Sequence, residues 1–168
     1  MHLISWIMTL LLLQVLPAAA QSGAFPWKAG DAPPPVAGIR LGDGRPRLEA
    51  VLGRPSETQQ LEKDAWAFTY RKRGVQVLFT PLDGAAIIYL LNRRAGDIGG
   101  VRLGDMQEAV LARWGEPPII QGDTAIYRAG AWVVVLKLDQ KNRVKQLGLG
   151  RAAEKAETKE GTYYRKND

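Results

Sequence analysis

One short motif occurs twice in this chain of 168 residues, at positions 38–43 and again at 100–105. Both copies read Gly, an aliphatic residue, Arg, Leu, Gly and Asp, and the likeness continues without a gap to Pro55 and Pro117. Eight of the eighteen aligned positions are identical. A match of this length at a fixed spacing predicts a duplicated structural unit. The fold must therefore be one that two similar segments can build together.

Each copy predicts a short helix directly after the repeated Gly-Asp pair. In the second copy we expect Asp105 to be the N-cap and Glu108 to be its capping-box partner. Gly115 and Pro117 are expected to end this helix, because proline cannot continue it. In the first copy Pro46 is compatible with a helix because it lies in the first turn.

After each helix the apolar residues alternate as they do in strands. Three strands are expected in each copy: residues 65–70, 75–80 and 85–91 in the first, and residues 124–127, 131–138 and 144–149 in the second. We therefore predict an α+β fold, a tandem repeat of one helix plus a three-stranded antiparallel meander. The two sheets are expected to be joined or packed side by side.

The chain is expected to divide into five segments. They are a signal peptide (1–20), an extended Pro-rich lead-in (21–37), repeat unit 1 (38–99), repeat unit 2 (100–150) and a charged, disordered tail (151–168). The apolar N-terminal run predicts a cut after Ala20 and a periplasmic or secreted protein. Because the run has no preceding Lys or Arg, an uncleaved anchor is the alternative. In the lead-in, Phe25 and Trp27 are expected to dock on the domain.

Composition argues against most kinds of active site. The chain has no Cys, and its one His, His2, lies in the expected signal peptide. The mature protein would then lack the usual zinc, copper and haem ligands and the usual general base. We expect no metal, no cofactor, no enzyme activity and, without Cys, no lipid anchor. A hydrolase with carboxylate chemistry built from Asp64, Asp83 or Asp97 is the remaining enzymatic alternative.

The repeated pattern resembles a known fold family. The residues that carry the resemblance are Ile39, Leu41, Gly42, Asp43, Leu52, Gly53 and Pro55 in the first copy, and Val101, Leu103, Gly104, Asp105, Trp114, Gly115 and Pro117 in the second. They resemble the pattern of the BamE/SmpA outer-membrane assembly proteins and of the β-lactamase inhibitory protein (BLIP). The tandem form is more similar to the inhibitory protein, whose two units share one sheet. The resemblance implies a scaffold that binds other proteins, and it transfers no contact residue.

Basic residues form the first candidate binding surface. The formal net charge is +6, and the first twenty residues contribute nothing to it. Arg71, Lys72 and Arg73 occupy an expected hairpin tip, and Arg93 and Arg94 follow the expected third strand. Such clusters either keep a hairpin tip soluble or bind anionic lipid, lipopolysaccharide or an acidic protein. We do not expect nucleic acid as a partner, because no recognition module is present.

Aromatic residues on strands form the second candidate surface. Alternation places Trp66, Phe68 and Tyr70 on one face of a sheet, and Trp132 lies on a strand of the second copy. If that face has no helix over it, the aromatics form a platform for a protein interface. If the helices cover it, they belong to the core. The sequence leaves both alternatives open.

The expected function is therefore a non-enzymatic periplasmic protein-binding or scaffold protein of the bacterial envelope. Its partner would be another envelope protein. The alternative is a binding module for an anionic envelope ligand, such as lipid or lipopolysaccharide, bound through the basic hairpin tips.

Overall fold

The computed structural model describes residues 25–62 and 64–152. The expected signal peptide, its cut after Ala20 and all but the first two residues of the expected tail lie outside the described residues. Within the described residues, no helix has the length and apolar character needed to cross a membrane.

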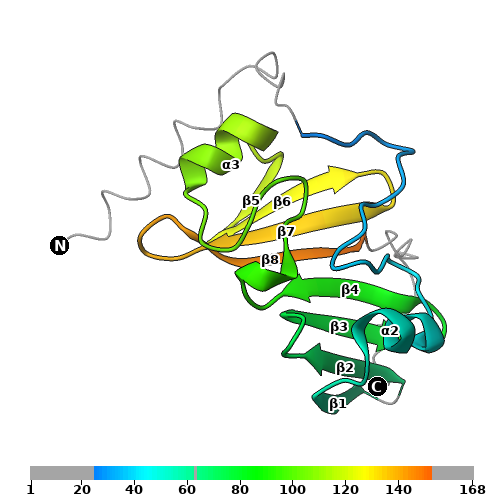
Figure 1. Cartoon of the computed structure of the whole chain (residues 1–168). Coiled ribbons are helices and arrows are strands. Elements are labelled where there is room, and N and C mark those ends of the chain that lie inside the picture. Colours follow the sequence, from blue (N-terminus) through cyan, green and yellow to red (C-terminus); the bar gives the residue numbers. More distant parts are fainter. Residues whose placement is uncertain (1–24, 63, 153–168) are drawn as a thin grey trace, which may run out of the picture.

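The strands form one antiparallel sheet of eight strands in the order β1-β2-β3-β4-β8-β7-β6-β5 (Figure 1). Their bounds are β1 Glu57–Glu62, β2 Ala65–Tyr70, β3 Val75–Thr80, β4 Gly84–Leu90, β5 Ile119–Gln121, β6 Thr124–Ala129, β7 Trp132–Leu138 and β8 Val144–Arg151. Helix α2 (Arg45–Leu52) precedes β1, and helix α3 (Gln107–Trp114) precedes β5; a short 3-10 helix, η3 (Arg93–Ala95), follows β4. We call β1 to β4 with α2 the first half and β5 to β8 with α3 the second half. The halves meet where β4 pairs with β8.

The prediction of a helix plus a three-stranded meander in each copy is wrong. The described residues form a single eight-stranded sheet with two short α-helices, and four strands lie on each side of the boundary between β4 and β8. The strands missing from the prediction are β1 and β5, which lie at the two edges of the sheet. β1 is mostly polar (ETQQLE) and β5 has only three residues, so neither shows apolar alternation. Residues 57–61 of β1 and all three residues of β5 are exposed, so these edge strands add little to the core and need no apolar alternation.

One face of the sheet carries the core. The strand pairing aligns one row of residues across six strands, consisting of Phe68, Val77, Ile88, Leu149, Val134 and Tyr127. Each residue of this row is at most 3% exposed. Buried side chains of both helices, including Leu48 of α2 and Trp114 of α3, belong to the same cluster. Both helices therefore cover the same face, and each fully buried large side chain stabilises the fold by about 1.5–3 kcal/mol.

The repeated Gly-Asp turns attach to the sheet in the same way in both halves. The Asp43 carboxylate accepts the backbone N–H of the residue three positions earlier at 2.8 Å, and its carbonyl accepts the N–H of Ala85 in β4 at 2.9 Å. Asp105 makes the same two bonds, at 2.8 Å to the N–H three positions earlier and at 2.9 Å to the N–H of Val144 in β8. The motif is thus a structural joint between each helix and the last strand of its half.

The expected N-cap at Asp105 is wrong. Helix α3 begins at Gln107, its N-cap is Met106, and no side chain caps it. The carboxylate closes the preceding turn instead, because a short Asp side chain bonds readily to backbone N–H groups of its own turn. The helices end before Gly53 and Gly115, which adopt φ angles of 84° and 72°, and for α3 this is the end expected from Gly115.

The described part of the lead-in packs on the second half of the sheet, as expected for its aromatics. Phe25 stacks on Tyr127 with ring centroids 5.1 Å apart, and Trp27 lies edge-on to Trp132 at 5.2 Å. The indole N–H of Trp132 donates to the carbonyl of Asp31 at 3.1 Å. These contacts complete the core beside α3.

Candidate functional site

The two basic clusters singled out from the sequence lie together at one end of the first half. The carbonyl of Gly74, which ends the β2–β3 turn, accepts the N–H of Leu91 at 2.7 Å. Gly74 also lies so close to the side chain of Asn92 that a Cβ there would overlap it. Because Asn92 directly precedes η3, the turn and η3 are neighbours. We call the five cations that this contact brings together the basic end; they are Arg71, Lys72, Arg73, Arg93 and Arg94.

The basic end is exposed and only loosely paired. All five residues are exposed. Arg71 forms an ion pair with Glu57 at 2.9 Å, and Arg93 forms one with Asp105 at 3.2 Å. Within the described ranges, Lys72 and Arg94 form no ion pair. Surface pairs of this kind contribute about 0–1 kcal/mol, so a stronger anion can replace them.

The candidate aromatics lie in the core rather than on an open platform. Phe68 and Tyr70 are each 3% exposed on the helix-covered face, and Trp132 is 4% exposed. Trp66 is half-buried and packs against the same cluster. Alternation correctly placed the three aromatics of β2 on one face, and this face lies under the helices. Phe68, Tyr70 and Trp132 therefore offer almost no surface to a partner, and Trp66 offers only part of its side chain.

The opposite face of the sheet is partly apolar. Its central residues, which are half-buried, are Leu78, Ile87, Tyr89, Val133, Val135 and Ile126. The ring of Tyr89 lies against Gly148 of the neighbouring strand, where a Cβ would come within 2.6 Å of it. This open face is a further candidate surface. It was not identified from the sequence, because alternation alone does not tell which face the helices cover.

A pocket of about 360 Å³ opens between α3 and strands β5 to β7. Its floor is apolar and consists of Val110, Leu111, Ala125, Tyr127, Leu136 and Leu138. Three carboxylates, Glu116, Asp123 and Asp139, line it as well, and no Lys or Arg does. No pattern in the sequence points to this pocket, because it depends on which strands pair.

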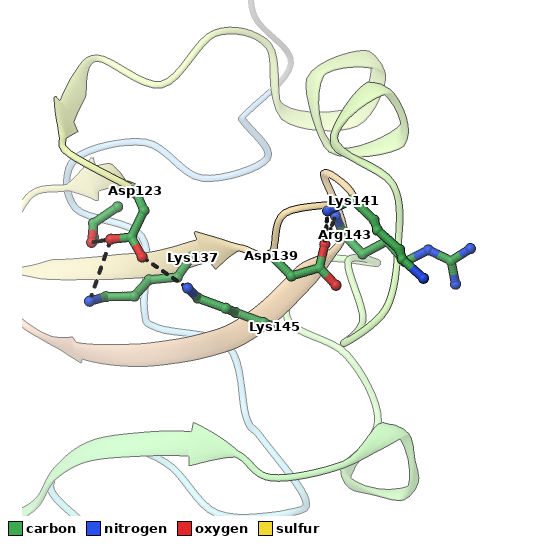
Figure 2. Close-up of polar contacts among 7 residues, drawn as sticks. Asp123, Lys137, Asp139, Lys141, Arg143 and Lys145 are labelled. Carbon is green, nitrogen blue, oxygen red and sulfur yellow. Dashed lines mark hydrogen bonds and ion pairs between the residues drawn. The ribbon is translucent and has the colours of Figure 1, made fainter. Parts of the chain in front are cut away.

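Asp123 lies on the turn between β5 and β6, close to two lysines (Figure 2). Its carboxylate accepts a hydrogen bond from Lys145 Nζ at 3.0 Å and from the Thr124 hydroxyl at 3.1 Å, and Lys137 Nζ lies 3.6 Å away. The bond from Lys145 is the main cause that lowers the pKa of Asp123 below the usual 3.8. Asp123 is therefore ionised at neutral pH.

Asp139 lies in the β7–β8 turn and is held by backbone bonds (Figure 2). Its Oδ1 accepts the N–H groups of Arg143 at 2.9 Å and Lys141 at 2.8 Å, and the bond from Arg143 is the largest influence that lowers its pKa below 3.8. At the floor of the pocket, burial and then the charge of Glu116 raise the pKa of Tyr127 to about 12. The pocket thus combines ionised carboxylates at its edge with a neutral phenol inside.

The carboxylates considered for hydrolysis do not form a common centre. Asp83 and Asp97 lie beyond opposite ends of β4, where Asp83 pairs with Arg151 at 3.6 Å and Asp97 pairs with Arg102 at 3.7 Å. Asp64 is exposed in the turn between β1 and β2. Among the residues that the structure describes, no group of three or more His, Cys, Asp or Glu side chains could hold a metal ion.

No protein-family model matches this chain, and no curated protein matches it. Its fold is similar to a cysteine-rich secretory protein from Staphylococcus aureus, with a TM-score of 0.59, 9% identity, and coverage of 74% of this chain and 46% of that one. A DUF4309 family protein, YjgB, from Bacillus subtilis has a TM-score of 0.46, 12% identity and coverage of 66% and 79%. An extracellular protein containing an SCP domain, from Bacillus anthracis, has a TM-score of 0.46, 10% identity and coverage of 66% and 43%.

These comparisons correct the family resemblance. The chain spans less than half the length of the staphylococcal protein, and at 9% identity the likeness concerns the fold alone. The structure with the similar fold is a secretory protein, and the described residues form one eight-stranded sheet instead of two helix-plus-meander units, so the resemblance to the BamE/SmpA proteins and to the β-lactamase inhibitory protein is wrong. The repeated residues that suggested it form turns and helix ends, which unrelated folds also need.

Proposed function

We propose that the protein is a non-enzymatic binding protein of the bacterial envelope whose basic end binds the anionic headgroups of envelope lipids. The observation that carries the proposal is the convergence of five exposed cations at one end of the first half. Cations that lie within a Debye length, about 10 Å at 0.1 M salt, reinforce one another's potential. Each Lys or Arg near an anionic membrane surface contributes about 1 kcal/mol of attraction.

Export from the cytoplasm is part of this proposal. The apolar run at the N-terminus and the small residues before Gln21 support it, with cleavage after Ala20 and release into the periplasm or the medium. The secretory description of the staphylococcal protein is compatible with it. A location outside the cytoplasm would place the basic end next to membrane headgroups or lipopolysaccharide.

Vesicle co-sedimentation tests the proposal. We expect binding to phosphatidylglycerol vesicles but not to phosphatidylcholine vesicles, and a steady loss of binding as salt rises. The triple variant Arg71→Gln, Lys72→Gln and Arg73→Gln is expected to bind about a hundredfold more weakly, at about 1 kcal/mol per residue.

A matched control removes three exposed cations elsewhere, with Arg128→Gln, Lys141→Gln and Arg143→Gln. It is expected to keep most of the affinity, because its loss of net charge is the same and only the position differs. Equal losses in the two triple variants would show that binding follows net charge alone, and the proposed role of the basic end would be abandoned.

Binding of another envelope protein is a second candidate function, favoured by the partly apolar face opposite the helices. A partner on that face would bury Leu78, Ile87 and Val133, so its binding would persist in high salt. The substitution Val133→Lys is expected to abolish such binding, whereas the triple Gln variant at the basic end would leave it unchanged. A partner that is lost in high salt would count against this candidate.

A further inference from the structure

The pairing of the strands establishes which positions of the two halves correspond. A β-bulge lies directly before Phe79 in β3 and directly before Leu138 in β7. Phe79 pairs with Ala85, and Leu138 pairs with Val144. Ala85 and Val144 are the residues that bond to the two repeated Gly-Asp turns. Phe79 and Leu138 are therefore counterparts.

The same register gives the counterpart of Phe68. Phe68 pairs with Val77, which lies two residues before Phe79. Ala125 pairs with Leu136, which lies two residues before Leu138. Phe68 of the first half therefore corresponds to Ala125 of the second half, where a large ring is replaced by a methyl group.

These two replacements account for the pocket. In the first half the rings of Phe68 and Phe79 lie 5.5 Å apart, and Phe68 is almost fully buried. In the second half Ala125 and Leu138, which occupy the corresponding positions, both line the pocket of about 360 Å³. This volume falls within the range of small-molecule sites, roughly 300–1,000 Å³. The space that aromatic side chains fill in one half is thus open to a ligand in the other.

The charge at the edge of the pocket selects the ligand. Glu116, Asp123 and Asp139 line the pocket without any Lys or Arg in its lining, although the chain as a whole carries a net charge of +6. Lys137 and Lys145, which do not line the pocket, both form ion pairs with Asp123 and so partly neutralise its charge. Glu116 has no ion pair among the described residues. Asp139 has none either, although its Oδ1 accepts two backbone N–H groups and the charges of Arg143 and Lys141 act on it, so Glu116 is the main group that attracts a cation.

We propose that this pocket binds a small amphipathic amine. Its apolar body, of about the size of a phenyl group, occupies the space beneath α3 against Ala125 and Leu138, and its ammonium group lies near Glu116 and Asp139. Burial of the ring supplies most of the affinity, because it removes apolar surface from water. The carboxylates supply the preference for a positive charge. This site is separate from the basic end, so either proposal can fail without the other.

Three probes that share a phenyl group and carry a positive, no or a negative charge test the site, namely phenethylamine, 2-phenylethanol and phenylacetate. Methyl NMR of the full chain would report binding at Val110, Leu111 and Leu136. We expect saturable shifts at these methyl groups and an affinity that decreases from the amine to the alcohol to the acid, with the amine at least about tenfold tighter than the acid. No shifts at the pocket methyls, or equal binding of the acid and the amine, would overturn the proposal.

Substitutions then separate the pocket from the rest of the surface. Ala125→Phe restores the ring that its counterpart Phe68 provides, and we expect it to abolish amine binding. Ala112→Phe, on the exposed side of α3, is the matched control and is expected to bind like the parent chain. A folded Ala125→Phe variant that still binds the amine would overturn the proposal.

A second pair of variants decides the question even if Ala125→Phe fails to fold. Glu116→Gln is expected to weaken binding of phenethylamine about threefold to tenfold while leaving 2-phenylethanol unchanged. Glu108→Gln, an exposed acid of α3 outside the pocket, is expected to change neither. If Glu116→Gln leaves amine binding unchanged, the proposed role of the carboxylates is refuted.

Discussion

The two halves of the sheet share a frame and differ in what they present to solvent. In the first half the β2–β3 turn carries Arg71, Lys72 and Arg73, and aromatic rings fill the space under α2. In the second half the β6–β7 turn is Gly130 and Ala131, and a pocket lies under α3. The residues that are identical between the copies build turns and helix ends. We therefore expect binding functions at the positions where the two copies differ.

The most disruptive test of the comparison removes corresponding core residues from the two helices. Trp114 and Leu52 align in the repeated sequence and are 1% and 6% exposed. We expect Trp114→Ala to lower the free energy of unfolding by about 3–5 kcal/mol, and Leu52→Ala to lower it by about 2–5 kcal/mol. Urea unfolding would measure both. Each variant should show one unfolding transition, because the β4·β8 pair joins the halves. Two separate transitions would show that the halves unfold independently.

A glycine at the joint between turn and sheet provides the next largest effect. Gly84 has a φ of 66°, and a Cβ there would lie 2.5 Å from the carbonyl oxygen of Gly42. Gly84→Ala is expected to cost about 3 kcal/mol, since left-handed strain and a clash with backbone add together. Gly122→Ala, with a φ of 60° and no atom within 4 Å, is the control and should cost only about 1–2 kcal/mol. Equal costs would mean that the turn does not dock closely on β4.

The two repeated aspartates give a smaller and symmetric effect. Asp43 and Asp105 each accept a backbone N–H at 2.8 Å within their own turn. We expect Asp43→Ala and Asp105→Ala each to lower the free energy of unfolding by about 1 kcal/mol. Thermal unfolding of both variants would show it. A cost confined to one of them would argue that the turns are not equivalent.

The smallest effect concerns how the stability contributed by the β7–β8 turn depends on pH. Asp139 of this turn corresponds to Thr80 in the first half, which is not an acid. Because the folded pKa of Asp139 is lowered, its bonds stabilise the protein above pH 3.8, and this contribution is lost as the pH falls through the folded pKa. Asp139→Asn should be less stable than the parent at neutral pH, and the difference should shrink in acid. Urea unfolding at several pH values would measure this difference, and a difference that stays constant between neutral and acid pH would contradict the expectation.

Local patterns predicted much of the frame. The alternation of apolar residues identified six of the eight strands, and Gly115 correctly marked the end of α3. Period two also placed Trp66, Phe68 and Tyr70 on one face. It could not tell which face the helices cover, because that depends on the packing of segments far apart in the chain. Sequence patterns did not predict the edge strands β1 and β5, because an edge strand can be polar or very short.

The candidate sites were less accessible to sequence reasoning. Each basic cluster was visible, but their convergence depends on the contact between Gly74 and Asn92, which lie on different turns. The pocket was invisible, because it arises from the replacement of Phe68 by Ala125 in a register that only the pairing reveals. The gap-free alignment of the repeats ends before these strands, and the loops between them differ in length.

The most direct test of the account is to map where an anionic lipid binds, using amide NMR and soluble short-chain phosphatidylglycerol. We expect shifts at residues 71–74 and 93–95 that weaken as salt rises, and none at the corresponding β6–β7 turn, Gly130 and Ala131. Shifts of equal size at both turns, or shifts that salt does not reduce, would contradict the claim that the halves share a frame but divide the binding functions between them.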